Sequence, residues 1–240
     1  MSTGSADGCP DLRYIVDCAG SAQSFTIVRE GQRAVTGEGL GDLLSLLEED
    51  LVVALQRRRP NLLFLHSAAV EWDGKAYLFA AESGSGKSTT TWGLLRHGFG
   101  YLSDELSPVE LDSLAVLPYP HALCLKQPPP APYPLPEHAI HLGRTIHIPA
   151  GTLAVASVSA PTAIGAVFLV RQHPGLHAPT LRKLSLAEAS ARLYVTALNP
   201  LAHPNHGLDA VARVAEHAPC FSLESADLSS TCALIRSLVA

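Results

Sequence analysis

Aromatic residues and positive charge are both scarce in this 240-residue sequence. Phe, Trp and Tyr together make up 6% of the residues. The chain has 17 Lys and Arg against 22 Asp and Glu, which gives a net charge of −5. Proteins that bind nucleic acids generally present a basic surface to the phosphates, and single-strand binders add aromatic side chains for stacking. The composition therefore predicts no nucleic-acid partner.

Long hydrophobic runs are also missing. No stretch approaches the ~20 apolar residues that a membrane-spanning helix needs. Residues 1–10 are polar and include Asp7, so we expect no signal peptide. The five cysteines are odd in number and form no close pair, which is typical of free thiols in a reducing compartment. These absences predict a cytoplasmic protein with no membrane partner.

The first quarter of the chain has a pattern of its own. Short β-rich runs at 14–16 and 25–28 are separated by Gly and Ser, and leucines then recur at helical spacing from Leu40 to Leu55. Pro60 ends this helical pattern. We therefore predict a small N-terminal β-rich segment with one helix over residues 1–60, and a single domain over residues 61–240.

In residues 61–240, strand-like and helix-like segments alternate, which predicts an α/β fold. Asp73-Gly74 is a hairpin signal, and Ser185 with Glu188 forms a capping box. Eight of the nineteen residues 118–136 are proline, so we expect a surface loop there. The expected strands are 62–70, 76–81, 99–103, 163–170 and a short one at Phe221, and the expected helices are 87–97, 186–198, 208–217 and 226 onward.

The strongest motif lies between an apolar strand and a helix, at Ala81–Ser88. It fits the phosphate-loop pattern with Ala in place of the first Gly. Glycines let successive N–H groups turn toward a phosphate, the helix N-terminus adds positive potential, the Lys reaches the β- and γ-phosphates, and the Ser hydroxyl holds Mg²⁺. The predicted nucleotide-binding residues are Ser83, Gly84, Ser85, Gly86, Lys87, Ser88 and Thr89.

Two adjacent carboxylates, Asp104 and Glu105, end the next predicted strand, seventeen residues beyond Lys87. Beside a phosphate loop, one carboxylate can bind Mg²⁺ while the other accepts the proton of an attacking hydroxyl. The sequence alone does not say which carboxylate takes which role.

Taken together, these motifs resemble the catalytic core of the HPr kinase/phosphorylase superfamily. The similarity is dense over residues 62–106 and looser over 107–126 and 163–240. It is greatest to the short HPr-kinase-like serine kinases, including those of lasso-peptide biosynthesis. The segments that carry it are Leu65-His66-Ser67-Ala68-Ala69-Val70, the hairpin 74–81, Glu82-Ser83-Gly84-Ser85-Gly86-Lys87-Ser88-Thr89, Gly98, and Leu102-Ser103-Asp104-Glu105-Leu106.

This resemblance implies a P-loop nucleotide-binding core like that of the C-terminal domain of HPr kinases and of phosphoenolpyruvate carboxykinase. It also implies phosphoryl transfer from ATP to a hydroxyl, with Asp104 as the general base. Glu105 would hold Mg²⁺ together with Ser88, at a position where the larger family has a second Asp. His66 and Lys87 would lie near the transferred phosphate.

We therefore expect an ATP- and Mg²⁺-dependent kinase acting on a serine-type hydroxyl of a peptide or small protein. The open alternatives are a kinase for a small-molecule hydroxyl and a nucleotide-binding adaptor without catalysis, and a homo-oligomer is also left open. Arg144, Arg171 and Lys126 are candidates for further substrate contacts. Histidine pairs in Pro/Gly-rich segments lack neighbouring ligands, so we expect no zinc site.

Overall fold

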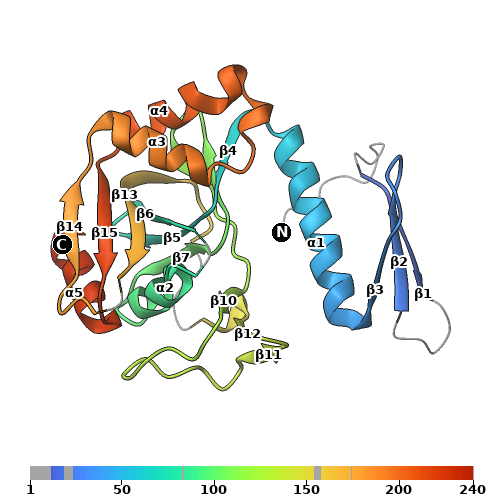
Figure 1. The fold of residues 1–240 in the computed structure, drawn as a ribbon, viewed down its shortest axis with the longest axis horizontal. Helices are drawn as coiled ribbons and strands as arrows, with labels where there is room; N and C mark the ends of the chain where they lie inside the picture. The colour runs from blue at the N-terminus through green and yellow to red at the C-terminus, as the bar shows by residue number, and fades with distance from the viewer. Residues whose placement is uncertain (1–11, 19–23, 83, 154–157, 174, 240) are drawn as a thin grey trace. The chain divides into compact units, whose positions relative to one another are not determined.

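The computed structural model describes residues 12–18, 24–82, 84–153, 158–173 and 175–239 (Figure 1). The chain forms two compact units, one up to Leu55 and one from Gln56 onward. This division does not decide the boundary predicted after residue 60, which stays a prediction. No helix among the described residues is long and apolar enough to cross a membrane.

The first unit is an antiparallel meander followed by a helix. Phe25 and Ile27 of its middle strand are buried, while Tyr14 donates from its hydroxyl to Asp50 on the helix at 2.8 Å. These elements confirm the predicted β-rich segment and helix. Their bounds are β1 (Tyr14–Cys18), β2 (Ser24–Arg29), β3 (Val35–Glu38) and α1 (Gly39–Arg58), and α1 runs into the second unit.

Nine strands form one curled sheet in the described part of the second unit. Along the sheet the order is β4-β8-β9-β13-β6-β5-β7, with β15 also paired to β13, and β14 beyond β15. The strands are β4 (Leu62–Leu65), β5 (Ser67–Trp72), β6 (Lys75–Ala80), β7 (Gly100–Ser103), β8 (Ser107–Glu110), β9 (Ala115–Val116), β13 (Thr162–Gln172), β14 (Thr180–Lys183) and β15 (Cys220–Ser225).

Helices cover both faces of this sheet (Figure 1). Pairs β6–β13 and β13–β15 are parallel, whereas the other pairs are antiparallel, so the sheet is mixed. One face packs on α2 (Lys87–Leu95) and α5 (Leu228–Val239), and the other on α3 (Leu186–Thr196) and α4 (Leu208–His217). The predicted α/β class is confirmed at this level.

Burial on both faces explains why β6 is apolar from Ala76 to Ala80. Successive side chains of a strand point to opposite faces. Tyr77 and Phe79 belong to the apolar cluster on the α2 side, where Phe79 stacks on Phe168 with ring centroids 5.1 Å apart. Leu78 and Ala80 belong to the cluster on the α3 and α4 side. Packing on both faces therefore fixes the end of β6, where the following loop begins.

The predicted single strand over 62–70 is wrong, because the chain breaks at His66. β4 pairs with β8, but β5 pairs with β6 and β7, so the two halves have different neighbours. The amide of His66 leaves both ladders and donates to the carbonyl of Thr196 at 2.7 Å. This break leaves His66 at the junction of two strands rather than inside one.

The proline-rich stretch is only partly the surface loop that was predicted. It contains β10 (Leu123–Leu125), which joins β11 (Ile140–Leu142) and β12 (Thr145–Ile148) in a small side sheet. Tyr133 is buried, and its carbonyl accepts from the indole N–H of Trp92 at 3.3 Å. The apolar cluster under α2 holds this part of the chain in place, a tertiary contact that proline content does not reveal.

The predicted helices form, with small shifts at their ends. Ser185 caps α3 by accepting from the amide of Glu188 at 3.3 Å. The carboxylate of Glu188 pairs with Arg182 in two hydrogen bonds of 2.7 and 2.9 Å. α2 ends at Leu95, two residues before the predicted end.

We predict that Asn199→Ala lowers the free energy of unfolding by about 3 kcal/mol, because buried backbone groups then lose their partners. The Asn199 amide accepts from the N–H of Phe64 at 2.9 Å and donates to the carbonyls of Leu62 at 2.9 Å and Gln56 at 3.3 Å. Denaturant unfolding measures the change. As a control, the exposed amide of Gln172 is removed by Gln172→Ala, with an expected change below about 0.5 kcal/mol. Equal effects of the two changes would contradict the prediction.

Candidate functional site

The loop between β6 and α2 has the backbone that the glycine pattern predicts. Gly84 and Gly86 both have φ of 88°, in the left-handed region that side chains other than glycine rarely adopt. Gly86 is the N-cap of α2, and no side chain caps this helix. The first amides of α2 therefore have no partner within the helix and point out of its N-terminus. Ser83 lies outside the described residues.

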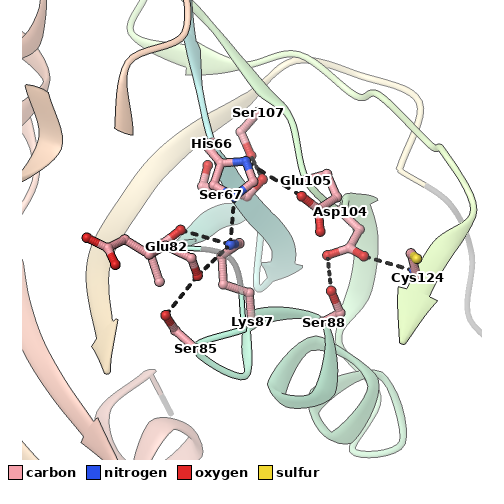
Figure 2. A network of polar contacts seen from close by, with 11 residues as sticks. His66, Ser67, Glu82, Ser85, Lys87, Ser88, Asp104, Glu105, Ser107 and Cys124 are labelled. Atoms are coloured by element: carbon pink, nitrogen blue, oxygen red, sulfur yellow. Dashed lines mark hydrogen bonds and ion pairs between the residues drawn. The ribbon is translucent and has the colours of Figure 1, made fainter. Parts of the chain in front are cut away.

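Lys87 is almost fully buried at the start of α2. Its Nζ donates to the carbonyls of Ala81 at 2.8 Å and Glu82 at 3.2 Å, and lies 2.9 Å from Nε2 of His66 (Figure 2). Burial is the main cause that lowers the pKa of Lys87. The ammonium is thus held between the glycine loop and the junction of β4 and β5.

Asp104 is fully buried just after β7, and both of its carboxylate oxygens accept a hydrogen bond. Ser88 donates from its hydroxyl to Oδ1 at 3.1 Å, and the amide of Cys124 donates to Oδ2 at 3.0 Å (Figure 2). Burial raises the pKa of Asp104 to about 6, although these two hydrogen bonds oppose the shift. One carboxylate therefore joins the first turn of α2, the end of β7 and the side sheet.

The carboxylate of Glu105 faces His66 (Figure 2). Glu105 has a backbone φ of 68°, an uncommon conformation for a residue with a side chain. Its Oε2 lies 3.6 Å from Nδ1 of His66, and 45% of its side chain is exposed. Burial first, and then the charge of Lys87, lower the pKa of His66. Because Nε2 faces an ammonium, the neutral ring carries its proton on Nδ1, facing Glu105.

A pocket of about 490 Å³ opens over these residues. The glycine loop and the first turn of α2 form one wall, the end of β10 with the following prolines forms a second, and Gln172 with the N-terminus of α5 forms a third. Glu105 also lines the pocket. Among the residues that the structure describes, no group of three or more His, Cys, Asp or Glu side chains is placed to hold a metal ion.

The structure brings most of the predicted site residues together. The lining of the pocket includes Gly84, Gly86, Lys87, Ser88, Thr89 and Glu105. His66 and Asp104 contact these residues, and Ser85 turns back to donate to the carbonyl of Glu82 at 2.7 Å. Of the three further candidates, only Lys126 is among the described residues that line the pocket; Arg144 and Arg171 are exposed elsewhere.

Sequence reasoning missed two parts of this site. The first is the hydrogen bond from the amide of Cys124 to Asp104, which joins residues twenty positions apart. The wall from Ser225 to Leu228 begins at the last residue of β15, a strand that pairs in parallel with β13. Neither segment carries a local motif that could have identified it.

Comparison with protein-family models finds no match to this chain, and neither does comparison with curated protein sequences.

We predict that the raised pKa of Asp104 makes the folded state less stable as pH rises. The folded protein holds this proton up to about pH 6, whereas the unfolded chain releases it near 3.8. Relative to Asp104→Asn, the wild type should therefore lose about 2 kcal/mol of unfolding free energy between pH 4 and pH 7. Denaturant unfolding of both proteins at each pH measures this difference.

Asp227→Asn is the matched control, because hydrogen bonds from Ser230 lower the pKa of Asp227. For Asp227 the sign is opposite, so the wild type should lose stability relative to this variant as pH falls below about 4. A difference between wild type and Asp104→Asn that stays constant with pH would contradict the prediction for Asp104.

Proposed function

We propose that the protein is an ATP- and Mg²⁺-dependent kinase that transfers the γ-phosphate to a serine-type hydroxyl of a peptide or small protein. The observation that carries this proposal is the hydrogen bond between Ser88 at the start of α2 and Asp104 after β7. In nucleotide-hydrolysing and kinase sites of the phosphate-loop type, a Ser or Thr and an Asp in this relation hold Mg²⁺ beside the nucleotide.

The glycine loop supports a triphosphate as the ligand. The uncapped N-terminus of α2 presents backbone N–H groups and positive potential, which favour phosphate oxygens. Lys87 adds a full positive charge at the same place, and the pocket has the volume of a small-molecule site. The loop, the lysine and the pocket therefore all suit the phosphates of a nucleotide.

The oxygen atoms around Ser88 fit Mg²⁺. This cation prefers oxygen ligands and, in nucleotide sites, is bound by one or two carboxylates together with substrate phosphates. The Ser88 hydroxyl and the Asp104 carboxylate lie 3.1 Å apart and would hold the ion, whose charge would stabilise the phosphate oxygens. An ionised Asp104 is costly in this buried position, and a cation beside it would offset that cost.

The contacts favour a division of roles between the carboxylates that is the reverse of the one implied by the resemblance. Asp104 is buried, and both of its oxygens are engaged with Ser88 and Cys124. Glu105 is half exposed, lines the pocket and faces His66. We therefore propose Asp104 as the metal-binding carboxylate and Glu105 as the group that an acceptor hydroxyl reaches. Its exposure suits an acceptor carried on a peptide.

The proposed transfer step uses side chains and backbone amides that line or adjoin the pocket. The acceptor oxygen attacks the γ-phosphorus, the bond from that phosphorus to the β–γ bridging oxygen breaks, and ADP leaves. Glu105 takes the hydroxyl proton, while the Nδ1–H of His66 orients its carboxylate. Lys87 and the α2 amides hold the phosphates in line, so catalysis is positioning and charge stabilisation.

We predict that Glu105→Gln lowers the rate of transfer at least 100-fold and leaves the affinity for Mg²⁺-ATP unchanged, because only the proton acceptor is lost. Asp104→Asn should lower the rate and also raise the Mg²⁺ concentration needed for half-maximal ATP binding. Calorimetric titration of ATP at several Mg²⁺ concentrations, with a transfer assay, separates the two effects.

Lys87→Ala should weaken ATP binding itself, because it removes the ammonium proposed to hold the phosphates. The same titration measures this loss.

Three results would change this assignment. If Glu105→Gln transfers phosphate at the wild-type rate and Asp104→Asn loses only transfer, Asp104 is the base, as the resemblance implies. If neither variant alters transfer, the proposed site is wrong. If the wild-type protein binds no ATP in the presence of Mg²⁺, the kinase proposal fails as a whole.

The acceptor can be identified with ATP labelled at the γ-phosphate and size-fractionated extract of the source cells. We expect label in a peptide or small-protein fraction with the wild type and none with Glu105→Gln. Label in the metabolite fraction would favour a small-molecule kinase. ATP binding without transfer to any fraction would favour a non-catalytic nucleotide-binding protein.

A further inference from the structure

Lys126 lies over the glycine loop, although it comes from the side sheet rather than from the loop or α2. A Cβ atom on Gly84 would lie 4.0 Å from the Nζ of Lys126. Both residues line the pocket. The ammonium of Lys126 is therefore close to the backbone that would surround a phosphate group.

The buried strand β10 fixes the backbone just before Lys126. Leu123 and Leu125 are buried in the apolar cluster under α2. Lys126 is the first residue after β10, and it lines the pocket together with Cys124, Leu125 and Gln127. The backbone of Cys124 is fixed by its bond to Asp104. The buried leucines thus anchor Lys126 at the pocket wall.

Two lysines at one end of the pocket make a cationic site. The charge of Lys126 helps to lower the pKa of both Lys87 and His66. Burial is the largest cause of both shifts, and Lys126 is the smallest of those named. Like charges placed together destabilise each other, and an anion between them removes that cost. Asp104 and Glu105 supply negative charge nearby, and a bound Mg²⁺ would neutralise it.

The remaining wall of the pocket has the opposite sign. Asp227 lines it at the N-terminus of α5. Hydrogen bonds from Ser230 lower the pKa of Asp227, so it is a carboxylate at neutral pH. A carboxylate repels phosphate, whereas the wall with Lys126 attracts it. The charge distribution of the pocket thus favours phosphates at the glycine loop and the uncharged part of the ligand at α5.

We propose that Lys126 is a second phosphate-binding residue, which contacts the β- and γ-phosphates of the nucleotide from the side opposite α2. Lys87 lines the same pocket at the start of α2, so the triphosphate would lie between two ammonium groups. This assignment rests on the proposed kinase function, and it makes the side sheet part of the nucleotide site. A nucleoside monophosphate, which lacks the β- and γ-phosphates, gains nothing from Lys126.

Calorimetric titrations of Mg²⁺-ATP, AMP and inorganic tripolyphosphate test the proposal on wild type, Lys126→Met and Lys126→Arg. We expect Lys126→Met to weaken ATP and tripolyphosphate binding about 10- to 100-fold, the usual effect of losing a charged hydrogen bond. AMP binding should be unchanged, and Lys126→Arg should retain most of the affinity for ATP. Lys183→Met, which removes an exposed lysine of β14, is the matched control and should behave as the wild type.

The outcomes separate the two proposals. If the wild type binds ATP, Lys87→Ala weakens that binding and Lys126→Met does not, the role of Lys126 is wrong while the kinase proposal stands. Equal loss of ATP and AMP binding in Lys126→Met would also overturn it, because the effect would not depend on the terminal phosphates. If the wild type binds neither ATP nor tripolyphosphate, both proposals fail. Thermal unfolding of each variant verifies that the exposed substitution leaves the fold intact.

Discussion

The buried carboxylate of Asp104 is the constraint around which the site is arranged. Its two hydrogen bonds connect three elements that are distant in the sequence: α2 through Ser88, the end of β7 through its own backbone, and β10 through the amide of Cys124. Burying a charge costs free energy, and the raised pKa of Asp104 reflects that cost. A fold that needed only stability would place an apolar side chain here, so this carboxylate supports the proposal of a binding or catalytic site.

Local sequence signals predicted the elements whose structure depends on neighbouring residues. The hairpin at Asp73-Gly74, the cap at Ser185 and the bounds of α4 all follow from such signals. The break at His66 was not predictable in this way, because it arises where β4 and β5 pair with different strands. Burial of Tyr133 likewise depends on Trp92, forty-one residues earlier, and no local pattern within a proline-rich stretch indicates it.

For the site, too, short motifs predicted the residues, whereas contacts between distant segments were not predictable. Lys87, Ser88, Asp104 and Glu105 could be selected from two short motifs, and the strand–loop–helix context around the first motif is present. Which carboxylate lies beside Ser88 could not be read from adjacent positions in a sequence. It depends on the left-handed backbone of Glu105, which turns consecutive side chains to different partners, and on the arrival of β10 at Asp104.

The position of β10 has a consequence for how nucleotide binding would affect the protein. This short strand supplies the Cys124 amide to Asp104, and its leucines pack under α2. The residue that follows the strand, Lys126, places its ammonium in the pocket near Gly84. A ligand that draws Lys126 toward the glycine loop therefore pulls on a strand that is also bonded to the proposed metal-binding carboxylate. Phosphate binding and metal binding would then stabilise one arrangement of β10, and each would strengthen the other, because both act on the same rigid segment. Under the proposed function, this arrangement of β10 would be most stable in the complex with both nucleotide and cation, the state from which transfer would proceed.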